Sequence, residues 1–374
     1  MRLHRTLSLA MTALMMLSGL VVFSSQASAH VPIYDSGGPT MDSALQIPNP
    51  SISYATYAEF EAKPNQIQFY SISVTENQKQ YIELDVPSVG SSKGFAPILL
   101  LIGPGLSAPD QNTSDMLNFF GVNLTAGQGA LSWEYKGPLT EEEFEPFTQV
   151  VLLKRQSLNV TLPESGTYYI CVTQQPFHPK PNENYIFVVT KYILVTGTLE
   201  KFTVADYILI PYDWIKGHLF WDENPAFFML PTYAVVIGGI ATAALLRRSR
   251  PTPSAVGVRR PEQLVFYVAL AGGLLMLGGA VNQLIFLFGN PLFSLGIGET
   301  IVLTLQSIGI VLGIFAIRQS FTVLKPTKWF RIFVAAVVFA IALIVGAGFI
   351  VGPVLFLAAV VAGFTMSRRK VQAA

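Results

Sequence analysis

The residues best suited to chemistry in this sequence are its histidines, because an imidazole binds metal ions and transfers protons near neutral pH. His30 directly follows Ala27-Ser28-Ala29, a small-x-small signal peptidase site, so cleavage there would make it the first residue. The free α-amine and the ring Nδ1 of such a histidine can chelate one Cu(II) ion, which heads the affinity order for nitrogen ligands. Copper is therefore the candidate cofactor, and His178 and His218 are the other candidate ligands.

The rest of the sequence gives this metal site little support. No His-x-His or His-x₃-His pair is present, so a polar residue that simply follows a cleavage site is the simpler interpretation of His30. Cys171 is the only cysteine, which excludes an intramolecular disulfide. It lies in the apolar run Tyr-Tyr-Ile-Cys-Val, which favours a buried, unreactive thiol over a metal ligand.

Signatures of enzymes are missing as well. The sequence has no His-Glu-x-x-His, Walker or Cys-x-x-Cys motif, which argues against an enzyme without excluding one. The cluster Glu141-Glu142-Glu143-Phe144-Glu145 lacks the alternating ligands and the glycine of a calcium loop. It is interpreted as a solvated acidic turn, or as the start of a helix after Thr140.

The amino-terminal residues 1–29 predict a secretory signal peptide. Arg2 and Arg5 form its positive region, Leu7 to Phe23 its apolar region, and Ala27-Ser28-Ala29 its cleavage site. An uncleaved membrane anchor is the alternative.

The carboxy-terminal part, residues 227–367, predicts an all-α transmembrane bundle of about five helices. The final apolar stretch is too long for one helix across a bilayer, and Gly346-Ala347-Gly348 is a natural turn within it. One long tilted helix is the alternative to this hairpin. Pairs such as Gly272-Gly273 and Gly309-x₃-Gly313 indicate close helix packing. The five predicted spans are residues 227–246, 264–288, 297–317, 329–346 and 350–366.

The distribution of charge supports this topology. Residues 30–228 contain 21 acidic and 10 basic residues, whereas residues 229–374 contain 12 basic and two acidic residues. Five spans, the first of which enters from outside, place all 12 cations on the cytoplasmic side, in the loops and in the tail 368–374. We therefore predict a multi-pass protein of the cell membrane with its large domain extracytoplasmic and its C-terminus cytoplasmic. The acidic outer domain argues against nucleic acid as a partner.

Residues 203–226, which precede the first span, are predicted to lie at the outer membrane interface. Aromatic side chains with a polar edge settle at the level of the lipid headgroups. The predicted interface residues are Tyr207, Tyr212, Trp214 and Trp221. A ligand-stacking site is the alternative.

Residues 30–202 are predicted to form an extracytoplasmic, jelly-roll-like β-sandwich. Gln66–Val74 and Gln80–Val86 alternate polar and apolar residues, and similar short runs continue as far as Asn184–Tyr192, separated by Gly, Pro and Asn. Strands with this spacing are typical of an antiparallel sandwich. Residues 103–147 are predicted to be an insertion, which is where binding surfaces commonly lie.

These runs resemble the bacterial pre-peptidase C-terminal (PPC-like) type of β-sandwich. The most characteristic part is the corner Pro163-Glu164-Ser165-Gly166-Thr167-Tyr168-Tyr169, and Gln68–Ile72, Tyr81–Val86 and Asn184–Val189 also carry the resemblance. The resemblance implies a non-catalytic accessory or binding domain.

The sequence as a whole favours a membrane-anchored extracytoplasmic binding or assembly protein, a non-catalytic subunit of an envelope complex. Its expected partners are the lipid bilayer and other envelope or membrane proteins. The first alternative is a copper-binding receptor or metalloenzyme subunit that uses His30 after signal cleavage. The second is a transporter with an external capture domain, for which Asn282, Gln283 and Gln306 are the polar candidates within the spans.

Overall fold

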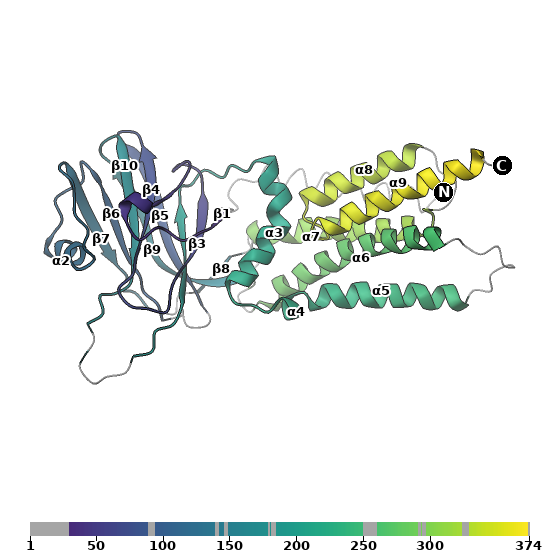
Figure 1. Ribbon diagram of the computed structural model, residues 1–374, viewed down its shortest axis with the longest axis horizontal. Coiled ribbons are helices and arrows are strands. Elements are labelled where there is room, and N and C mark those ends of the chain that lie inside the picture. Colours follow the sequence, from purple (N-terminus) through teal and green to yellow (C-terminus); the bar gives the residue numbers. More distant parts are fainter. Residues whose placement is uncertain are drawn as a thin grey trace. The chain divides into compact units, whose positions relative to one another are not determined.

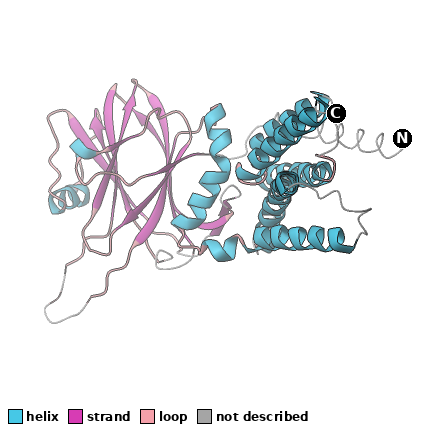
Figure 2. Ribbon diagram, turned by 45° about the vertical axis from the view of Figure 1, so that its right-hand side comes forward, coloured by secondary structure: helices cyan, strands magenta, loops and turns pink. Residues whose placement is uncertain are grey.

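The computed structural model describes residues 30–88, 94–138, 142–145, 149–178, 180, 185–249, 260–290, 293, 297–323 and 329–372. The predicted signal peptide, residues 1–29, lies outside these residues. The chain divides into two compact units (Figures 1 and 2): a sheet unit within residues 28–145 and 150–202, and a helical unit from residue 203 onward.

The sheet unit contains a six-stranded sheet with the strand order β1-β3-β11-β5-β9-β8. Its neighbouring strands are antiparallel except β1 and β3, which are parallel. The strands are β1 (Val31–Tyr34), β3 (Tyr54–Phe60), β11 (Thr190–Thr196), β5 (Gln78–Pro87), β9 (Val150–Leu162) and β8 (Glu142–Glu145).

A second, five-stranded sheet has the order β2-β4-β10-β6-β7. It is antiparallel except between β2 and β4, so both sheets are mixed rather than purely antiparallel. A short 3₁₀ helix, η1 (Met41–Ser43), precedes β2, and helix α2 (Gln111–Phe119) lies between β6 and β7. The strands are β2 (Leu45–Gln46), β4 (Ile67–Val74), β10 (Gly166–Thr173), β6 (Ile98–Pro104) and β7 (Gln128–Glu134).

Alternate residues of the strands supply two hydrophobic layers, as period-two patterns require. Tyr70 and Ile72 of β4 join Leu84 of β5 in a core to which both sheets contribute. Phe69 and Cys171 point to the other layer, where the five-stranded sheet packs against Met116 and Leu117 of α2. The prediction of a buried Cys171 thiol is therefore confirmed, and burial raises its pKa.

One polar group of three side chains is built into the first core. The Tyr70 and Tyr192 hydroxyls lie 2.6 Å apart, and the Tyr192 hydroxyl donates to Oε1 of Gln68. Gln68 in turn donates from Nε2 to the main-chain oxygen of Glu59 (2.7 Å). Burial raises the pKa of both tyrosines. Because the partners come from β3, β4 and β11, these bonds fix the relative register of strands in both sheets.

Two segments differ from the sequence-based expectations, and the predicted insertion has elements of its own. Residues 103–147, which stay a predicted insertion, contain α2, β8 and the whole of β7, which pairs with β6 along its length. The acidic cluster is not a turn or a helix start where it is described, because Glu142–Glu145 pairs with Val150–Leu153 as strand β8. The strand expected at Asn184–Tyr192 begins only at Thr190.

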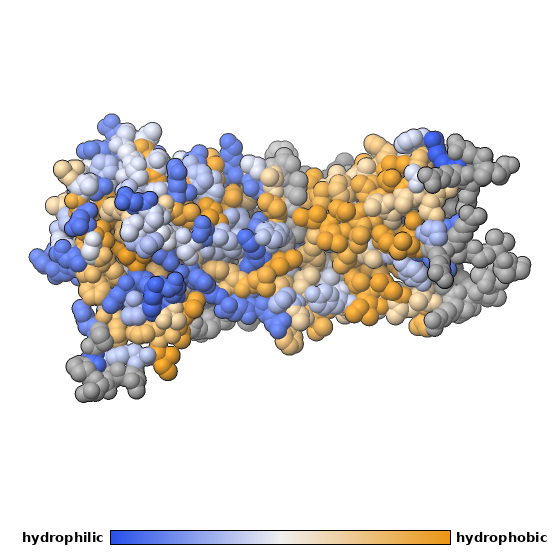
Figure 3. All heavy atoms as spheres, in the orientation of Figure 1, coloured by the Kyte–Doolittle hydropathy of each residue, from blue (hydrophilic) through white to orange (hydrophobic). Residues whose placement is uncertain are grey.

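The five apolar segments of the carboxy-terminal part lie on helices α5 to α9. Of the described helices, α6, α7 and α9 are long and apolar enough to span a membrane, and the apolar parts of α5 and α8 are shorter. Many outward-facing side chains of this unit are hydrophobic (Figure 3), as a lipid environment requires. The helices are α3 (Val204–Phe220), α4 (Pro225–Phe228), α5 (Leu230–Ser249), α6 (Arg260–Gly289), α7 (Ile297–Ser320), α8 (Trp329–Ile344) and α9 (Val351–Gln372).

Close packing around α6 follows from its glycines. A Cβ on Gly272 would lie 2.7 Å from the main chain of α9, and one on Gly273 would lie 2.6 Å from Ile317 of α7. A Cβ on Gly313 of α7 would lie 2.6 Å from the nitrogen of Leu277 in α6. The prediction that these small residues allow close helix packing is confirmed.

Gly103 tests the core of the sheet unit, because a Cβ at this position would lie 2.1 Å from the buried Tyr168 ring. We expect Gly103→Ala to lower the free energy of unfolding by about 1–3 kcal/mol, as overpacking of a filled core does. The measurement is the melting temperature of the detergent-purified chain, followed by circular dichroism of the sheets. Gly94→Ala is the matched control, because no atom lies within 4 Å of its added Cβ. Equal melting temperatures for the two variants would contradict the expectation.

Candidate functional site

An exposed hydrophobic surface of the sheet unit lies on the segment that connects β10 to β11 (Figure 1), whose described residues 174–178, 180 and 185–189 are called the arm here. Within its described residues, Ile186 is 92% exposed, Val188 47% and Val189 40%. A single exposed aliphatic residue needs no explanation, but three within four residues form a hydrophobic surface.

The arm is held together by its own aromatic residues. The Phe177 ring lies 4.6 Å from the Tyr185 ring and 5.2 Å from the Phe187 ring, edge to face in both cases. The Tyr185 hydroxyl also accepts a hydrogen bond from the main-chain nitrogen of Lys180 (3.2 Å). Phe187 and Tyr185 therefore turn toward Phe177, while the alternate residues Ile186 and Val188 face solvent.

The base of the arm is fixed by Asn65, a residue of the β3–β4 turn. Its Oδ1 accepts from the nitrogen of Phe177 (2.8 Å), and its Nδ2 donates to the oxygen of the same residue (3.1 Å). Asn65 has a φ of 58°, a left-handed conformation that asparagine tolerates better than most residues. One side chain thereby replaces the two main-chain partners that a neighbouring strand would supply.

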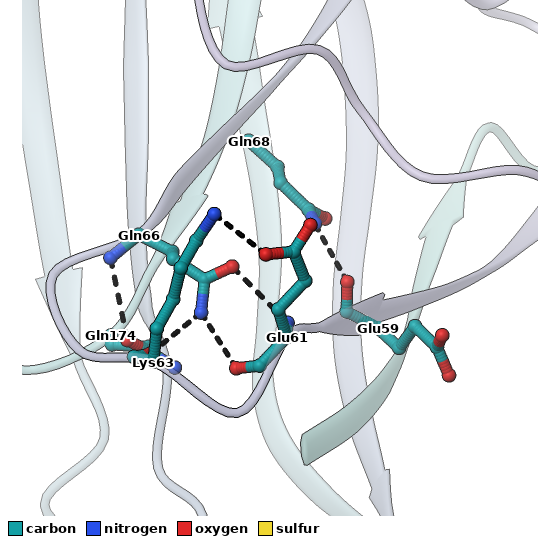
Figure 4. A network of polar contacts seen from close by, with 6 residues as sticks. All are labelled: Glu59, Glu61, Lys63, Gln66, Gln68 and Gln174. Carbon is teal, nitrogen blue, oxygen red and sulfur yellow. Dashed lines mark hydrogen bonds and ion pairs between the residues drawn. The ribbon is translucent and has the colours of Figure 1, made fainter. Parts of the chain in front are cut away.

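Gln66 supplies the second attachment (Figure 4). Its main-chain nitrogen donates to Oε1 of Gln174 (3.3 Å), the first residue of the arm. Its own amide closes the turn, donating to the oxygens of Glu61 (2.8 Å) and Lys63 (2.7 Å) and accepting from the Glu61 nitrogen (3.1 Å). An exposed ion pair between Lys63 and Glu61 (2.6 Å) adds little to stability. The turn is thus a preformed support for the arm.

Sequence reasoning treated this part of the chain as a strand and missed the arm. A usable signal was present: Pro176, Pro179 and Pro181 precede the hydrophobic run, and proline cannot donate to a strand ladder. The sequence could not show that Asn65 holds Phe177, because the two residues are 112 positions apart in the chain.

The three candidate metal ligands have different neighbours. His30 Nδ1 lies 2.5 Å from the Ser53 hydroxyl, and the exposed His178 ring packs against Phe119 of α2 (5.2 Å). His218 belongs to the helical unit. Within the part of the chain that the structure describes, no group of three or more His, Cys, Asp or Glu residues is placed to hold a metal ion.

His218 is fully buried in an aromatic cluster of the helical unit. Its ring lies 4.3 Å from Trp214, 5.0 Å from Phe228 in a stacked arrangement, and 5.3 Å from Phe286 of α6. Its Nδ1 lies 2.9 Å from Oε2 of Glu223, so the carboxylate accepts a hydrogen bond from the imidazole. The cluster joins α3, α4 and α6, so His218 contributes to the packing of these helices.

The predicted interface residues occupy different environments. Tyr212 is 49% exposed, and Lys216 lies 5.1 Å above its ring, an arrangement suited to the headgroup region. Trp214 and Trp221 are buried among other side chains. The side chain of Tyr207 lies outside the described residues.

Buried amides mark the polar part of the helix interior. Asn282 is fully buried, and neither its Oδ1 nor its Nδ2 has a hydrogen-bond partner. Oε1 of the buried Gln306 is also without one. Gln283 is buried as well. We have no physical account of the unpartnered amide of Asn282.

Comparisons with known proteins give no family for this chain. No family model and no curated protein matches it. Among solved structures, it is similar to the crystal structure of Aeromonas hydrophila PliG, a periplasmic lysozyme inhibitor of g-type lysozyme. The sequence identity is 14% and the TM-score 0.22, over 45% of this chain and 98% of that chain. At this TM-score the similarity supports no conclusion about fold or function.

The aromatic cluster predicts the effect of truncating His218. We expect His218→Ala to destabilise the helical unit by about 2–4 kcal/mol, because it leaves a cavity among the rings of Trp214, Phe228 and Phe286. His218→Phe keeps the ring and removes only the hydrogen bond to Glu223, so its loss should be smaller. The measurement is the melting temperature of the detergent-purified protein. If His218→Ala has the same melting temperature as the wild type, the histidine does not hold α3, α4 and α6 together.

Asp213 of α3 predicts a pH dependence. Burial raises its pKa from 3.8 to about 6, Asp206 adds to the rise, and Lys216 opposes it. The folded protein therefore binds the proton of the Asp213 carboxyl more strongly than the unfolded chain does. The stability that the protonated carboxyl contributes is present below about pH 4 and is lost as the pH rises above 6.

We expect Asp213→Asn to melt close to the wild type at pH 4 and above it at pH 7, because the asparagine carries no buried charge. Melting curves at both values check this, with the exposed Asp42→Asn as the control. If the difference in melting temperature between the wild type and Asp213→Asn is the same at both pH values, the raised pKa of Asp213 is contradicted.

Proposed function

We propose that this protein is a membrane-anchored binding or assembly protein and acts as a non-catalytic subunit of an envelope complex. In this proposal the sheet unit is a jelly-roll-like β-sandwich of the PPC-like type, held outside the cytoplasm by five transmembrane helices. The observation that supports the proposal is the hydrophobic arm, because Ile186 (92% exposed) and Val188 (47% exposed) form an apolar surface on a preformed base.

The membrane part of the proposal is supported by helix length and by charge. The helices α6, α7 and α9 are long enough to cross a bilayer. Helix α8 has 16 residues, about 24 Å at 1.5 Å per residue, and a short span of this kind is accommodated by local thinning of the bilayer. The arginines Arg318, Arg331 and Arg368 then lie at helix ends on one side, as the positive-inside rule requires.

The binding part of the proposal follows from the energetics of the arm. Removing a fully exposed isoleucine or valine from water is worth about 1.5–3 kcal/mol per side chain. Ile186, which is 92% exposed, has almost all of this to gain from a partner, and Val188, which is 47% exposed, has about half. The support at Asn65 and Gln66 means that a partner does not have to order the base of the arm. A hydrophobic patch with a preformed base is typical of a docking surface.

A protein partner fits this surface better than the bilayer does. Residues 30–228 carry 21 acidic and 10 basic residues, and a surface with this excess is repelled by anionic lipid headgroups. Hydrophobic anchors surrounded by polar residues are the common composition of a protein–protein interface.

Site-specific photo-crosslinking in native membranes tests the proposal. A photoreactive residue in place of Val189 should form a protein adduct of defined mass, because the partner covers the arm. The double variant Ile186→Asp/Val188→Asp in the same background should reduce that adduct at least fivefold, since each change puts a charge into an apolar contact.

Leu199→Asp is the matched control, because Leu199 is 53% exposed on the same unit but lies outside the arm. It should leave the adduct unchanged. An adduct that survives the arm variant, or that contains lipid and no protein, would contradict the proposed function.

A further inference from the structure

A cavity of about 340 Å³ lies between α7, α8 and α9 in the helical unit. It is within the range of small-molecule pockets, which are about 300–1,000 Å³. Phe330 is both a lining residue and 70% exposed, so the cavity reaches the outer surface of the bundle. The other apolar lining residues are Phe315, Val323, Val334, Ala335, Phe356 and Val360.

Two polar side chains, Arg331 and Gln319, share this lining. Nη1 of Arg331 donates to the main-chain oxygen of Thr322 (3.0 Å), which uses one of the five N–H donors of its guanidinium. No described carboxylate forms an ion pair with it. A half-buried cation beside apolar walls is costly unless an anion meets it.

The same end of α8 and α9 carries the features of a headgroup level. The exposed Trp329 packs against Phe364 (4.9 Å between ring centroids). Arg368 lies 5.2 Å above the Trp329 ring and 4.8 Å above the Phe364 ring. Tryptophan and arginine together are typical of the boundary between acyl chains and headgroups.

We propose that this cavity binds an anionic phospholipid, with its phosphate at Arg331 and Gln319 and one acyl chain along the apolar lining. The guanidinium supplies charge-assisted hydrogen bonds to the phosphate oxygens. The phenylalanine and valine side chains supply a dry surface for the chain, which a soluble anion could not use. Basic pockets between transmembrane helices on the cytoplasmic side are known to select anionic headgroups. The proposal requires only that these helices lie in a bilayer, and it is independent of the partner of the arm.

Native mass spectrometry of the full chain in detergent, titrated with phosphatidylglycerol or phosphatidylcholine, tests this inference. The wild type should bind one phosphatidylglycerol about tenfold more tightly than phosphatidylcholine, and Arg331→Gln should remove that preference. Val334→Trp, which fills the cavity, should weaken both lipids. Glycerol 3-phosphate, which has the phosphate without the chains, should not displace the bound lipid.

Arg318→Gln is the matched control, because Arg318 is an exposed cation of α7 outside the cavity lining. It should change phosphatidylglycerol binding less than twofold. Unchanged melting temperatures show that the variants are folded. Equal affinity for the two lipids in the wild type, equal effects of Arg318→Gln and Arg331→Gln, or displacement by glycerol 3-phosphate would each overturn the proposal.

Discussion

Each main-chain N–H and C=O group that leaves water must find a partner within the chain, and this constraint governs both units. In the helical unit the partners lie within each helix, so side chains are left to decide how the helices meet. In the sheet unit the partners lie on neighbouring strands, so the register must be set by long-range contacts. The Gln68, Tyr70 and Tyr192 group shows how this is done, because its hydrogen bonds connect strands of both sheets inside an otherwise apolar core.

The arm is the place where the sheet unit meets the same requirement without a strand. Asn65 takes the role of a neighbouring strand at Phe177, and Gln66 extends the support to Gln174. Beyond this base the chain leaves both sheets and carries its aliphatic residues away from the core. The exposed parts of these residues add little to the stability of their own unit, which is why the proposed function gives them a partner.

The helical unit combines very close packing with an open space. Gly272, Gly273 and Gly313 bring α6 against its neighbours α7 and α9 at distances that no larger side chain allows. Between α7 and α8 the packing is looser, and the cavity with Arg331 lies there. Because the packing is looser here, Arg331 lies beside apolar side chains and the cavity reaches the outer surface of the bundle at Phe330. In the two proposals made above, the sheet unit contacts a protein and the helical unit contacts a lipid.

The sequence by itself determined the features that depend on local pattern. Period-two runs such as that of β4 predicted strands, and uninterrupted apolar runs predicted the helices. The single Cys171 in an apolar run was correctly predicted to be buried. Only the tertiary structure decided which apolar residues remain exposed, since Ile186 and Ile72 are the same residue type with opposite burial. The physical reason is distance along the chain: Phe177 is held by a residue 112 positions away, and such a contact leaves no periodic trace in the sequence.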